Sequence, residues 1–313
     1  MAALDVTPGL MPPLVSVLIP AFNHERYVLR CLDSVLEDSY PAKELIIIDD
    51  GSTDRTGARI ADWVAAHCMD IPIEYVRREH RGIAATLNEL AARANGEFLR
   101  PGASDDYLLP GGIGAQVRYL QEHPHKVAVI GDSMVVDGNG HKLHDSGMCD
   151  LHGADKSLYL TDDGIRRAVI RQWAIGGPVV LIRKCALDTA DRWSEGLRIE
   201  DWDLFLRLAA RNGLGFIDVH VCAYRLHASN VSRTRHKGAR IANLAESRQV
   251  ARFRAGLFKE PYRTLLRAQS HYIDAKISFL ERRPWPLLRH LAAYLALALR
   301  ARLPSVRQHA EGT

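Results

Sequence analysis

The feature that most constrains the fold is an alternation, through the first half of the chain, of short β-branched apolar runs with stretches of helical length. Residues 15–19 (VSVLI) and 45–48 (LIII) have the length and composition of buried strands. Helices are predicted at 27–37 and, behind the cap candidates at 52–54, up to residue 67. Such an alternation predicts parallel pairing through right-handed crossovers, and therefore a doubly wound α/β sheet.

The alternation of strands and helices continues to about residue 131, and beyond it the order of strands and helices is less regular. The first half adds three strands and one helix, at 73–77, 97–100, 127–131 and 82–94. A hairpin signal (DGNG) follows at 137–140. The second half is expected to hold strands at 179–183 and 215–224, a helix at 201–211, and helices from about 241. Ligands of doubly wound sheets bind beyond the carboxyl ends of the strands, where Phe22, Asp50 and Asp105 fall.

Composition excludes several classes of protein. Hydrophobic residues at 47% and charged residues at 25% are typical of globular proteins and exclude a disordered, collagenous or disulfide-based chain. The five scattered cysteines form no Cys-x-x-Cys pair, which favours a reducing compartment over a zinc site. No signal peptide and no run of ~20 apolar residues is visible, so a cytoplasmic location is expected.

Basic charge is confined to the tail. Residues 251–313 hold 12 Arg or Lys against 4 Asp or Glu, a local charge of +8, while the chain as a whole carries +4. A nucleic-acid enzyme would more often carry a basic face through its core, so no nucleic-acid partner is expected. A basic tail rich in leucine suits an anionic membrane surface.

Two acidic clusters follow predicted strands. Ser104, Asp105 and Asp106 form a loop that could hold Mg²⁺ or Mn²⁺ through carboxylate oxygens, although Ser-Asp-Asp is also ordinary turn chemistry. Asp49 and Asp50 end the second strand, where a carboxylate could accept the N3 hydrogen of uracil. Helix capping is the competing explanation for that pair.

Other polar and aromatic candidates are weaker alone. Phe22 follows the first strand and could stack on a base, or simply belong to the core. Glu200 and Asp201 open a predicted helix, where acids suit the helix dipole but where one could also act as a general base. His227 follows a strand and could ligate a metal, contact a phosphate, or be structural.

Taken in order, these segments resemble the family 2 glycosyltransferases of GT-A fold. The resemblance covers about residues 14–235. It rests on VSVLIPAFN (15–23), ELIIIDDGSTDRT (44–56), GIAATLN (82–88), GEF (96–98), SDDYLLP (104–110), Glu200-Asp201 and YRLH (224–227).

The resemblance implies a GT-A, Rossmann-like α/β fold with a mostly parallel sheet, and an inverting transfer from a nucleotide-diphosphate sugar, UDP-linked by default, to a hydroxyl. It implies Mn²⁺ or Mg²⁺ as cofactor and a glycan or lipid-linked acceptor, in polysaccharide, lipopolysaccharide or other glycan assembly. Asp201 would be the catalytic base, with Glu200 beside it. The donor would be bound by Pro20, Ala21, Phe22, Asn23, Asp50, Asn88 and Ser104, and the metal by Asp105, Asp106 and His227.

Two positions depart from the family pattern. The first acid of the family's Asp-x-Asp loop is Ala103 here, and we expect Ser104 or water to complete the metal site. Leu87 stands where many members carry Arg, which removes one phosphate contact.

The expected division is an arm at 1–13, a GT-A domain at 14–235 and a basic helical extension at 236–313. Residues 287–302 (LLRHLAAYLALALRAR) are too short to span a bilayer. With Trp285 before them, they would contact a membrane interface, or else pack on the domain or a partner subunit.

Two other functions compete. A nucleotidyltransferase would need a glycine-rich basic loop after the first strand, and residues 20–25 offer none. A non-catalytic nucleotide-sugar binder would explain Ala103, but it has no need of the Glu200-Asp201 pair.

Overall fold

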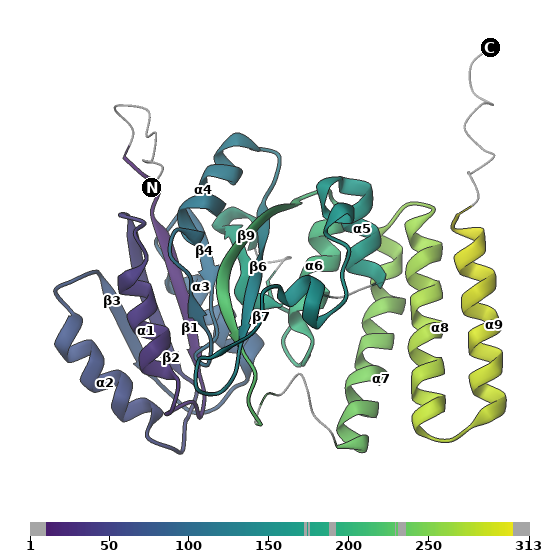
Figure 1. Ribbon diagram of the computed structural model, residues 1–313, viewed down its shortest axis with the longest axis horizontal. Coiled ribbons are helices and arrows are strands. Elements are labelled where there is room, and N and C mark those ends of the chain that lie inside the picture. The colour runs from purple at the N-terminus through teal and green to yellow at the C-terminus, as the bar shows by residue number, and fades with distance from the viewer. Residues whose placement is uncertain are drawn as a thin grey trace, which may run out of the picture.

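The structure is a computed structural model that describes residues 11–302 apart from 172–173, 175, 188–191, 229 and 231–235. Within that part of the chain, nine strands form one mixed sheet covered by helices (Figure 1). The strand order is β3-β2-β1-β4-β8-β6-β9-β5, and β7 pairs with β6 outside this path. The predicted arm at 1–13 falls mostly outside the described residues, as do residues 303–313.

The first four strands confirm the predicted parallel α/β unit. They are β1 (Val15–Ala21), β2 (Lys43–Asp49), β3 (Ile73–Arg77) and β4 (Phe98–Pro101), all paired in parallel. The connecting helices are α1 (Val28–Glu37), α2 (Thr56–His67) and α3 (Ile83–Arg93). Helices cover both faces of this sheet, which explains why its strands are continuously apolar.

Alternate side chains of one strand enter two different cores. Leu18 and Ile46 pack in a core with α3 and the later helices. Val17 and Ile47 pack on the other face with residues of α1 and α2. The runs of β-branched residues at 15–19 and 45–48 are therefore buried on both sides, as predicted from their composition.

The prediction of parallel pairing was wrong beyond β4. The strand expected at 127–131 is β6 (Ala128–Val136), which does not pair with β4, because β8 (Val180–Arg183) lies between them, antiparallel to both. β9 (Leu214–Arg225) pairs in parallel with β6, and β5 (Tyr107–Leu108) pairs antiparallel with β9. A strand from more than 40 residues downstream enters the sheet, and local periodicity carries no information about that partner.

The predicted hairpin turn is confirmed. Asp137 donates its N–H to His141, and the carbonyl of Asp137 accepts the N–H of Gly140. Gly140 has φ +91°, a conformation open to glycine. The turn joins β6 to β7 (Lys142–His144).

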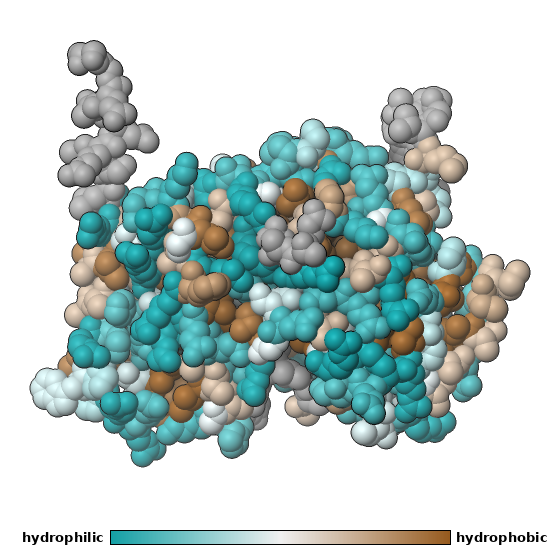
Figure 2. Space-filling model, turned by 180° about the vertical axis from the view of Figure 1, so that it is seen from behind, coloured by the Kyte–Doolittle hydropathy of each residue, from teal (hydrophilic) through white to brown (hydrophobic). Residues whose placement is uncertain are grey.

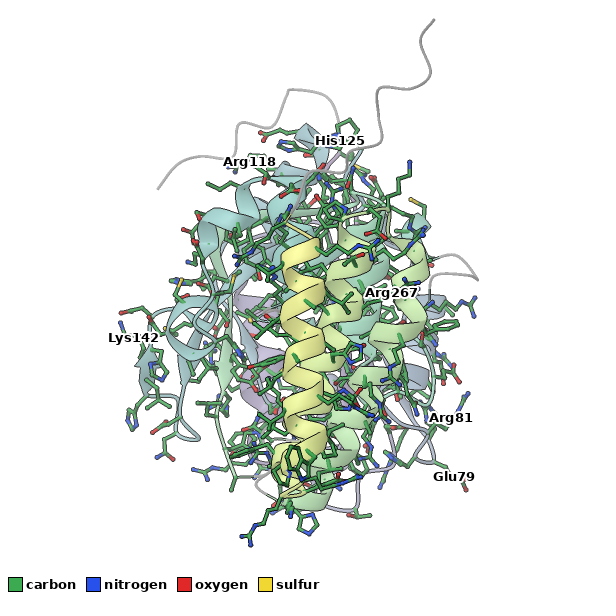
Figure 3. All side chains as sticks on the ribbon, turned by 90° about the vertical axis from the view of Figure 1, so that its right-hand side faces the viewer. Glu79, Arg81, Arg118, His125, Lys142 and Arg267 are labelled. Atoms are coloured by element: carbon green, nitrogen blue, oxygen red, sulfur yellow. The ribbon has the colours of Figure 1, made fainter. Side chains whose placement is uncertain are left out.

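The second half supplies the remaining helices. They are α4 (Gly112–Glu122), α5 (Asp162–Arg171), α6 (Glu200–Ala210), α7 (Lys237–Arg254), α8 (Tyr262–Leu280) and α9 (Pro284–Arg300), with a short 3₁₀ turn, η3 (Gly177–Val179), before β8. α7, α8 and α9 stand in a row at one end of the molecule, α9 outermost (Figures 1 and 3). Val250 and Leu265 belong to the same core as Leu18, so α7 and α8 are packed on the sheet domain.

The surface is mixed. Hydrophilic residues cover most of the rear face, and hydrophobic residues lie between them in separate patches (Figure 2). Among the helices of the described residues, none has both the length and the apolar character that a membrane crossing requires.

Candidate active site

Loops from four strands meet at one edge of the sheet. β1, β2 and β4 are parallel, and β8, antiparallel to β4, starts where β4 ends. β9 runs parallel to β6, which is antiparallel to β8, so its carboxyl end lies at this edge too. The residues that follow these strands include Phe22, Asp50, Asp105 and His227. This edge is where ligands of open α/β sheets bind.

Three side chains from three of these loops form a compact cluster. His227 Nε2 lies 2.9 Å from Asp105 Oδ2, and His24 Nε2 lies 3.7 Å from the same oxygen. The three ligand atoms all lie within 4.8 Å of one another. Two imidazoles and one carboxylate are a donor set suited to a divalent transition metal, so the residues present fit the implied ion.

The ionisation of the cluster agrees with that fit. Burial by itself would raise the pKa of Asp105, but the hydrogen bond with His227 and the charges of His24 and His227 lower it. Burial lowers the pKa of His24, against the opposing charge of Asp105. At neutral pH the cluster thus offers an ionised carboxylate and a neutral imidazole, the forms that coordinate metals.

Arg225, the last residue of β9, holds the Asp105 loop. Its Nε donates to the carbonyl of Asp105 at 2.8 Å, and its backbone N–H donates to Asp106 Oδ1 at 2.7 Å. The guanidinium also lies over the rings of Tyr27 and Tyr107. The loop is therefore fixed to the strand that carries His227.

Ser104 and Asp106 support the cluster rather than extend it. Ser104 Oγ lies 2.8 Å from Nδ1 of His24 and so orients the ring toward Asp105. Asp106 is buried, and burial together with the charge of Asp105 raises its pKa well above the usual range. Its carboxyl faces Arg225, so the geometry does not support the prediction that Asp106 shares the metal.

Sequence reasoning missed His24. It stopped at Asn23, one residue earlier, although a histidine directly after a strand-end loop is itself a signal of a possible ligand. Ala103 removes one acid from the loop after β4, while the loop after β1 brings His24 to the candidate cluster.

Phe22 and Asp50 lie on the β1–β2 side of the edge. Phe22 is 40% exposed, and its ring contacts that of His80, with centroids 4.4 Å apart and the ring planes tilted by 31°. Asp50 is buried; it accepts the backbone N–H groups of Arg81 at 2.9 Å and Gly82 at 2.8 Å and forms an ion pair with Arg78. Asp50 thus fixes the residues that precede α3. A nucleotide base bound here would share the carboxylate with those donors.

Asp49 has a structural role. Its Oδ1 accepts the N–H of Ser52 at 2.9 Å, and its Oδ2 lies 3.3 Å from Arg77 Nε. Asp54 accepts the N–H of Thr56 at the start of α2. Asp49 and Asp54 therefore account for the turn, and Asp50 is the carboxylate with no capping duty toward α2.

The other predicted donor contacts are backbone positions or braces. Pro20 and Ala21 are the last residues of β1, and Ala21 is fully buried. Asn23, at φ +54°, accepts the N–H of Thr53 through its side chain and so joins the β1 and β2 loops. Asn88 exchanges hydrogen bonds with the backbone of Trp193, at 3.0 Å each, which fixes the chain before α6.

Glu200 and Asp201 form the first turn of α6. Burial raises the pKa of Asp201 to about 7, although a backbone hydrogen bond from Gly177 opposes the shift. Burial and the adjacent charge of Asp201 raise the pKa of Glu200 to about 8. Because Gly177 opens η3, which packs against β4 just before β8, Asp201 belongs to the same edge as the Asp105 loop.

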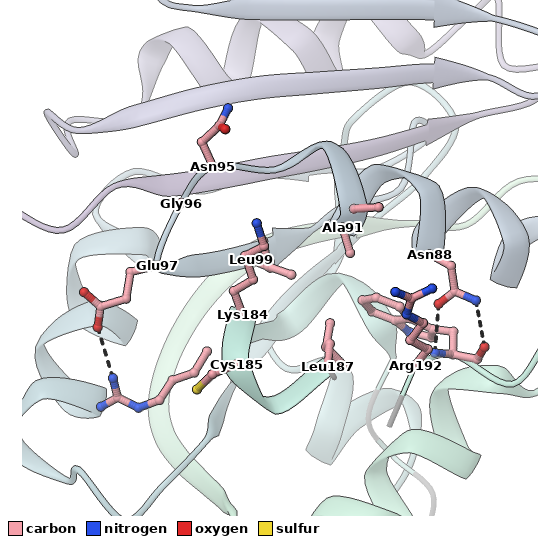
Figure 4. Close-up of a pocket in the computed structure, with 13 residues that line it drawn as sticks. Asn88, Ala91, Asn95, Gly96, Glu97, Leu99, Lys184, Cys185, Leu187 and Arg192 are labelled. Carbon is pink, nitrogen blue, oxygen red and sulfur yellow. Dashed lines mark hydrogen bonds and ion pairs between the residues drawn. The ribbon is translucent and has the colours of Figure 1, made fainter. Parts of the chain in front are cut away.

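Two cavities differ in their relation to this edge. One of 490 Å³ lies beside His227, between Tyr27 and the hairpin residues Gly138 and Asn139. The other, 970 Å³, lies at the amino end of β4 and is lined by residues such as Glu97 and Lys184 (Figure 4). The larger cavity lies at the opposite end of β4 from Asp105, so a ligand bound in it would not contact Asp105.

A second group of possible ligands lies between α8 and α9, where His271, Asp274 and His290 approach one another. Asp274 accepts hydrogen bonds from Arg248 at 2.9 Å and Arg252 at 2.7 Å. Two guanidinium groups already compensate this carboxylate, so a dication would be repelled there. The cluster joins α7, α8 and α9.

Comparisons with known proteins place the chain in a family. The model of glycosyl transferase family 2 matches residues 16–174, just over half of the chain. GlyG, a glycosyltransferase of Streptococcus pneumoniae, is 27% identical over 237 residues, which cover 72% of this chain and 74% of that protein. EpsE of Bacillus subtilis, also named as a glycosyltransferase, is 36% identical over 124 residues, 40% of this chain and 44% of its own length, so the match spans less than half of that relative.

Solved structures share the fold. TarS of S. aureus, solved with UDP-GlcNAc, superposes with a TM-score of 0.61 at 18% identity, over 91% of this chain and 81% of that one. The mannosyltransferase PcManGT of Pyrobaculum calidifontis, solved with GDP-Man and Mn²⁺, gives a TM-score of 0.62 at 21% identity, over 96% and 79%. These structures confirm the predicted GT-A fold. The match of the family model, which covers just over half of the chain, shows in addition that the chain belongs to glycosyl transferase family 2.

Proposed function

We propose that this glycosyltransferase transfers a sugar from a nucleotide diphosphate to an acceptor hydroxyl with inversion, using Asp201 as the general base. The observation that carries the proposal is the pairing, at one edge of the sheet, of a metal-type cluster with a carboxyl whose pKa is raised to about 7. A base near neutrality is efficient because it is ionised at working pH and still accepts a proton readily.

The nucleotide is proposed to lie along the ends of β1 and β2. Phe22 and His80 offer ring faces to a base, and Asp50 offers an acceptor to a base N–H. Uracil is our preferred base, because its single free N–H group, at N3, can donate a hydrogen bond to one carboxylate. TarS was solved with UDP-GlcNAc and PcManGT with GDP-Man, so relatives of this fold accept either nucleotide.

His24, Asp105 and His227 are the residues that would hold a divalent cation. Mn²⁺ is preferred over Mg²⁺, because two of the three ligands are imidazoles and Mg²⁺ favours oxygen. When bound, the cation would neutralise charge on the leaving diphosphate. Arg225 and Ser104 hold the Asp105 loop and the His24 ring in position.

Asp201 would take the proton of the attacking hydroxyl. Its place near η3, across from the Asp105 loop along the edge of the sheet, suits a base that acts on the face of the sugar opposite the leaving group. Glu200, next to Asp201, is a second carboxyl whose pKa is raised, so the two carboxyls titrate as a pair. A non-catalytic binder would have no reason to desolvate two carboxyls at such an edge.

A screen of nucleotide sugars tests the proposal. With Mn²⁺ present, the wild-type protein should bind a UDP-sugar, seen by calorimetry, and slowly release UDP in the absence of acceptor. Chelation with EDTA should weaken binding, and Mg²⁺ should restore it less well than Mn²⁺. Binding of no nucleotide sugar under any of these conditions would refute the assignment.

We also propose that α9 lies on an anionic membrane surface, which would bring a lipid-linked acceptor to the enzyme. None of its residues is buried, and Trp285, Leu288, Leu295 and Leu299 are between 58% and 81% exposed. Their spacing, continued by two exposed alanines at 292 and 296, places them on one face of the helix.

Charge favours lipid over a second copy of the chain. α9 contains no acidic residue, and exposed arginines lie at and near its ends, at 282, 283, 289, 300 and 302. Pairing two such helices would bring arginines together, whereas anionic headgroups would neutralise them. Within residues 11–302, as far as the structure describes them, α9 is the outermost helix at its end of the molecule, and no other helix or strand covers its outer face (Figure 3).

Vesicle binding tests this surface. The double variant Leu288→Ser/Leu295→Ser should bind vesicles of anionic phosphatidylglycerol at least about 10-fold more weakly, because two leucines no longer enter the interface. Leu143→Ser, which changes an exposed leucine of β7, is the matched control and should bind as the wild type does. Equal binding by the wild type and the double variant would disprove the membrane role of α9.

A further inference from the structure

The chain that leads into α6 is held by a carboxylate from α7. Glu246 Oε1 accepts the backbone N–H of Arg198 at 2.6 Å and that of Ile199 at 3.1 Å. Ile199 precedes α6 directly and has no side-chain oxygen with which to cap the helix. Glu246, from a helix far along the sequence, therefore satisfies the backbone N–H groups of the two residues that lead into α6.

A second contact holds α6 one turn further along. Asp203 is almost fully buried and forms a two-point ion pair with Arg254 at the end of α7, with Nε–Oδ1 2.6 Å and Nη2–Oδ2 2.9 Å. Arg207 and Ser194 donate to the same carboxylate. Residues of α7 thus bind the chain directly before Glu200 and also bind Asp203, two residues after Asp201.

The charges around Glu200 are few and one-sided. Burial, the charge of Asp201 and the charge of Glu246 all act to raise the pKa of Glu200. Arg198 directs its guanidinium to Asn243 of α7, at 3.4 Å. Arg254 and Arg207 are engaged by Asp203. Glu246 is therefore the charged group of α7 that acts on the Glu200 carboxyl.

We infer that Glu246 is a positioning residue for glycosyl transfer, which fixes the two residues that lead into α6 by its two backbone hydrogen bonds and places a negative charge beside Glu200. This inference rests on the proposed role of Asp201. It gives the C-terminal helices a part in the reaction, since the residues that position the base come from α7.

Two variants separate the two parts of this role. Glu246→Gln keeps an oxygen that can accept the N–H groups but removes the charge. Because a negative charge near Glu200 and Asp201 is lost, the pKa of this carboxyl pair should fall. The rise of kcat with pH should therefore occur about half a pH unit lower than in the wild type. The plateau kcat and the KM for the donor should stay within about two-fold of wild type.

Glu246→Ala also removes the hydrogen bonds. We expect the plateau kcat to fall about 10-fold, with the acid limb of the kcat profile moved down as in Glu246→Gln, while the donor KM is unchanged, because the base is displaced and the donor site is not. Amide hydrogen exchange over residues 199–203 should become faster, a readout that does not depend on turnover. Glu122→Gln, which changes an exposed residue of α4, is the control and should alter none of these quantities.

The outcomes distinguish this inference from the proposed function. Suppose that the wild type is active and that both variants have the same acid limb of the kcat profile, and the same amide exchange in α6, as the wild type. That result would overturn the role of Glu246 and leave the proposed glycosyl transfer intact. A wild type that binds donor but transfers to no acceptor, with exchange at α6 accelerated in Glu246→Ala, would confirm the brace and overturn the assignment of Asp201 as base.

Discussion

Asp201→Asn is expected to bind the donor as the wild type does and to lose about 10²- to 10⁴-fold in the rate of transfer. Asparagine has the shape of aspartate but cannot accept the proton of the attacking hydroxyl. The proposed donor contacts come from the β1, β2 and β4 loops, so the substitution should preserve them. The measurements are the donor Kd by calorimetry and kcat with an acceptor supplied in excess.

The pH dependence follows from the raised pKa. Only the ionised carboxylate can act as base, and burial raises the pKa of Asp201 to about 7. The wild-type kcat should therefore rise with pH through about 7 and level off above about 8, while an ordinary aspartate would give a plateau already at pH 5. The residual rate of Asp201→Asn should show no such rise.

An exposed carboxyl provides the control for this variant. Asp70 lies just after α2 and pairs with His67 at the surface, so Asp70→Asn should keep the full rate. If Asp201→Asn transferred sugar as fast as the wild type, another group would have to be the base, and the assignment would be wrong.

Asp105→Ala should weaken the binding of Mn²⁺, and of the nucleotide sugar in its presence, by at least about 100-fold. Asp105 supplies the only carboxylate of the cluster and the oxygen that both His24 and His227 approach. Without it two imidazoles remain, which is too few ligands for a site selective for a hard divalent cation. Calorimetric titration with Mn²⁺ alone and then with the donor measures both effects.

The variant should respond to metal differently from the wild type. In EDTA the two proteins should bind the nucleotide with similar, weak affinity, because the contacts of Phe22 and Asp50 do not involve Asp105. Asp62→Ala, at an exposed position of α2, should behave as the wild type. An unchanged Mn²⁺ affinity in Asp105→Ala would place the cation elsewhere.

Several features could be predicted from the sequence because they depend on neighbouring residues. The runs at 15–19 and 45–48 are strands because β-branched residues suit a backbone buried on both faces. The α6 helix ends at Ala210, and Asn212, two residues further on, adopts the positive φ that asparagine tolerates. Parallel strands bring their carboxyl ends to one edge, so the meeting of the Phe22, Asp50 and Asp105 loops was also predictable.

Other features were decided only by contacts between distant segments. β8 enters between β4 and β6 because its side chains pack in a core that the first half leaves open, and nothing within residues 97–131 announces it. Asp105 and Asp106 are adjacent and chemically identical, yet one faces His24 and His227 while the other is buried against Arg225. That difference arises from the pairing of β5 with β9.

The sequence by itself determined the strands β1 to β4, the helices α1 to α3 between them and the parallel pairing of this half of the sheet, because periodicity and turn chemistry act over a few residues. The tertiary structure decided which acidic side chains share a cluster, which are buried, and which proton affinities they acquire. These properties depend on desolvation and on charges brought close by folding, as Glu246 is to Glu200, and no local pattern encodes such distances.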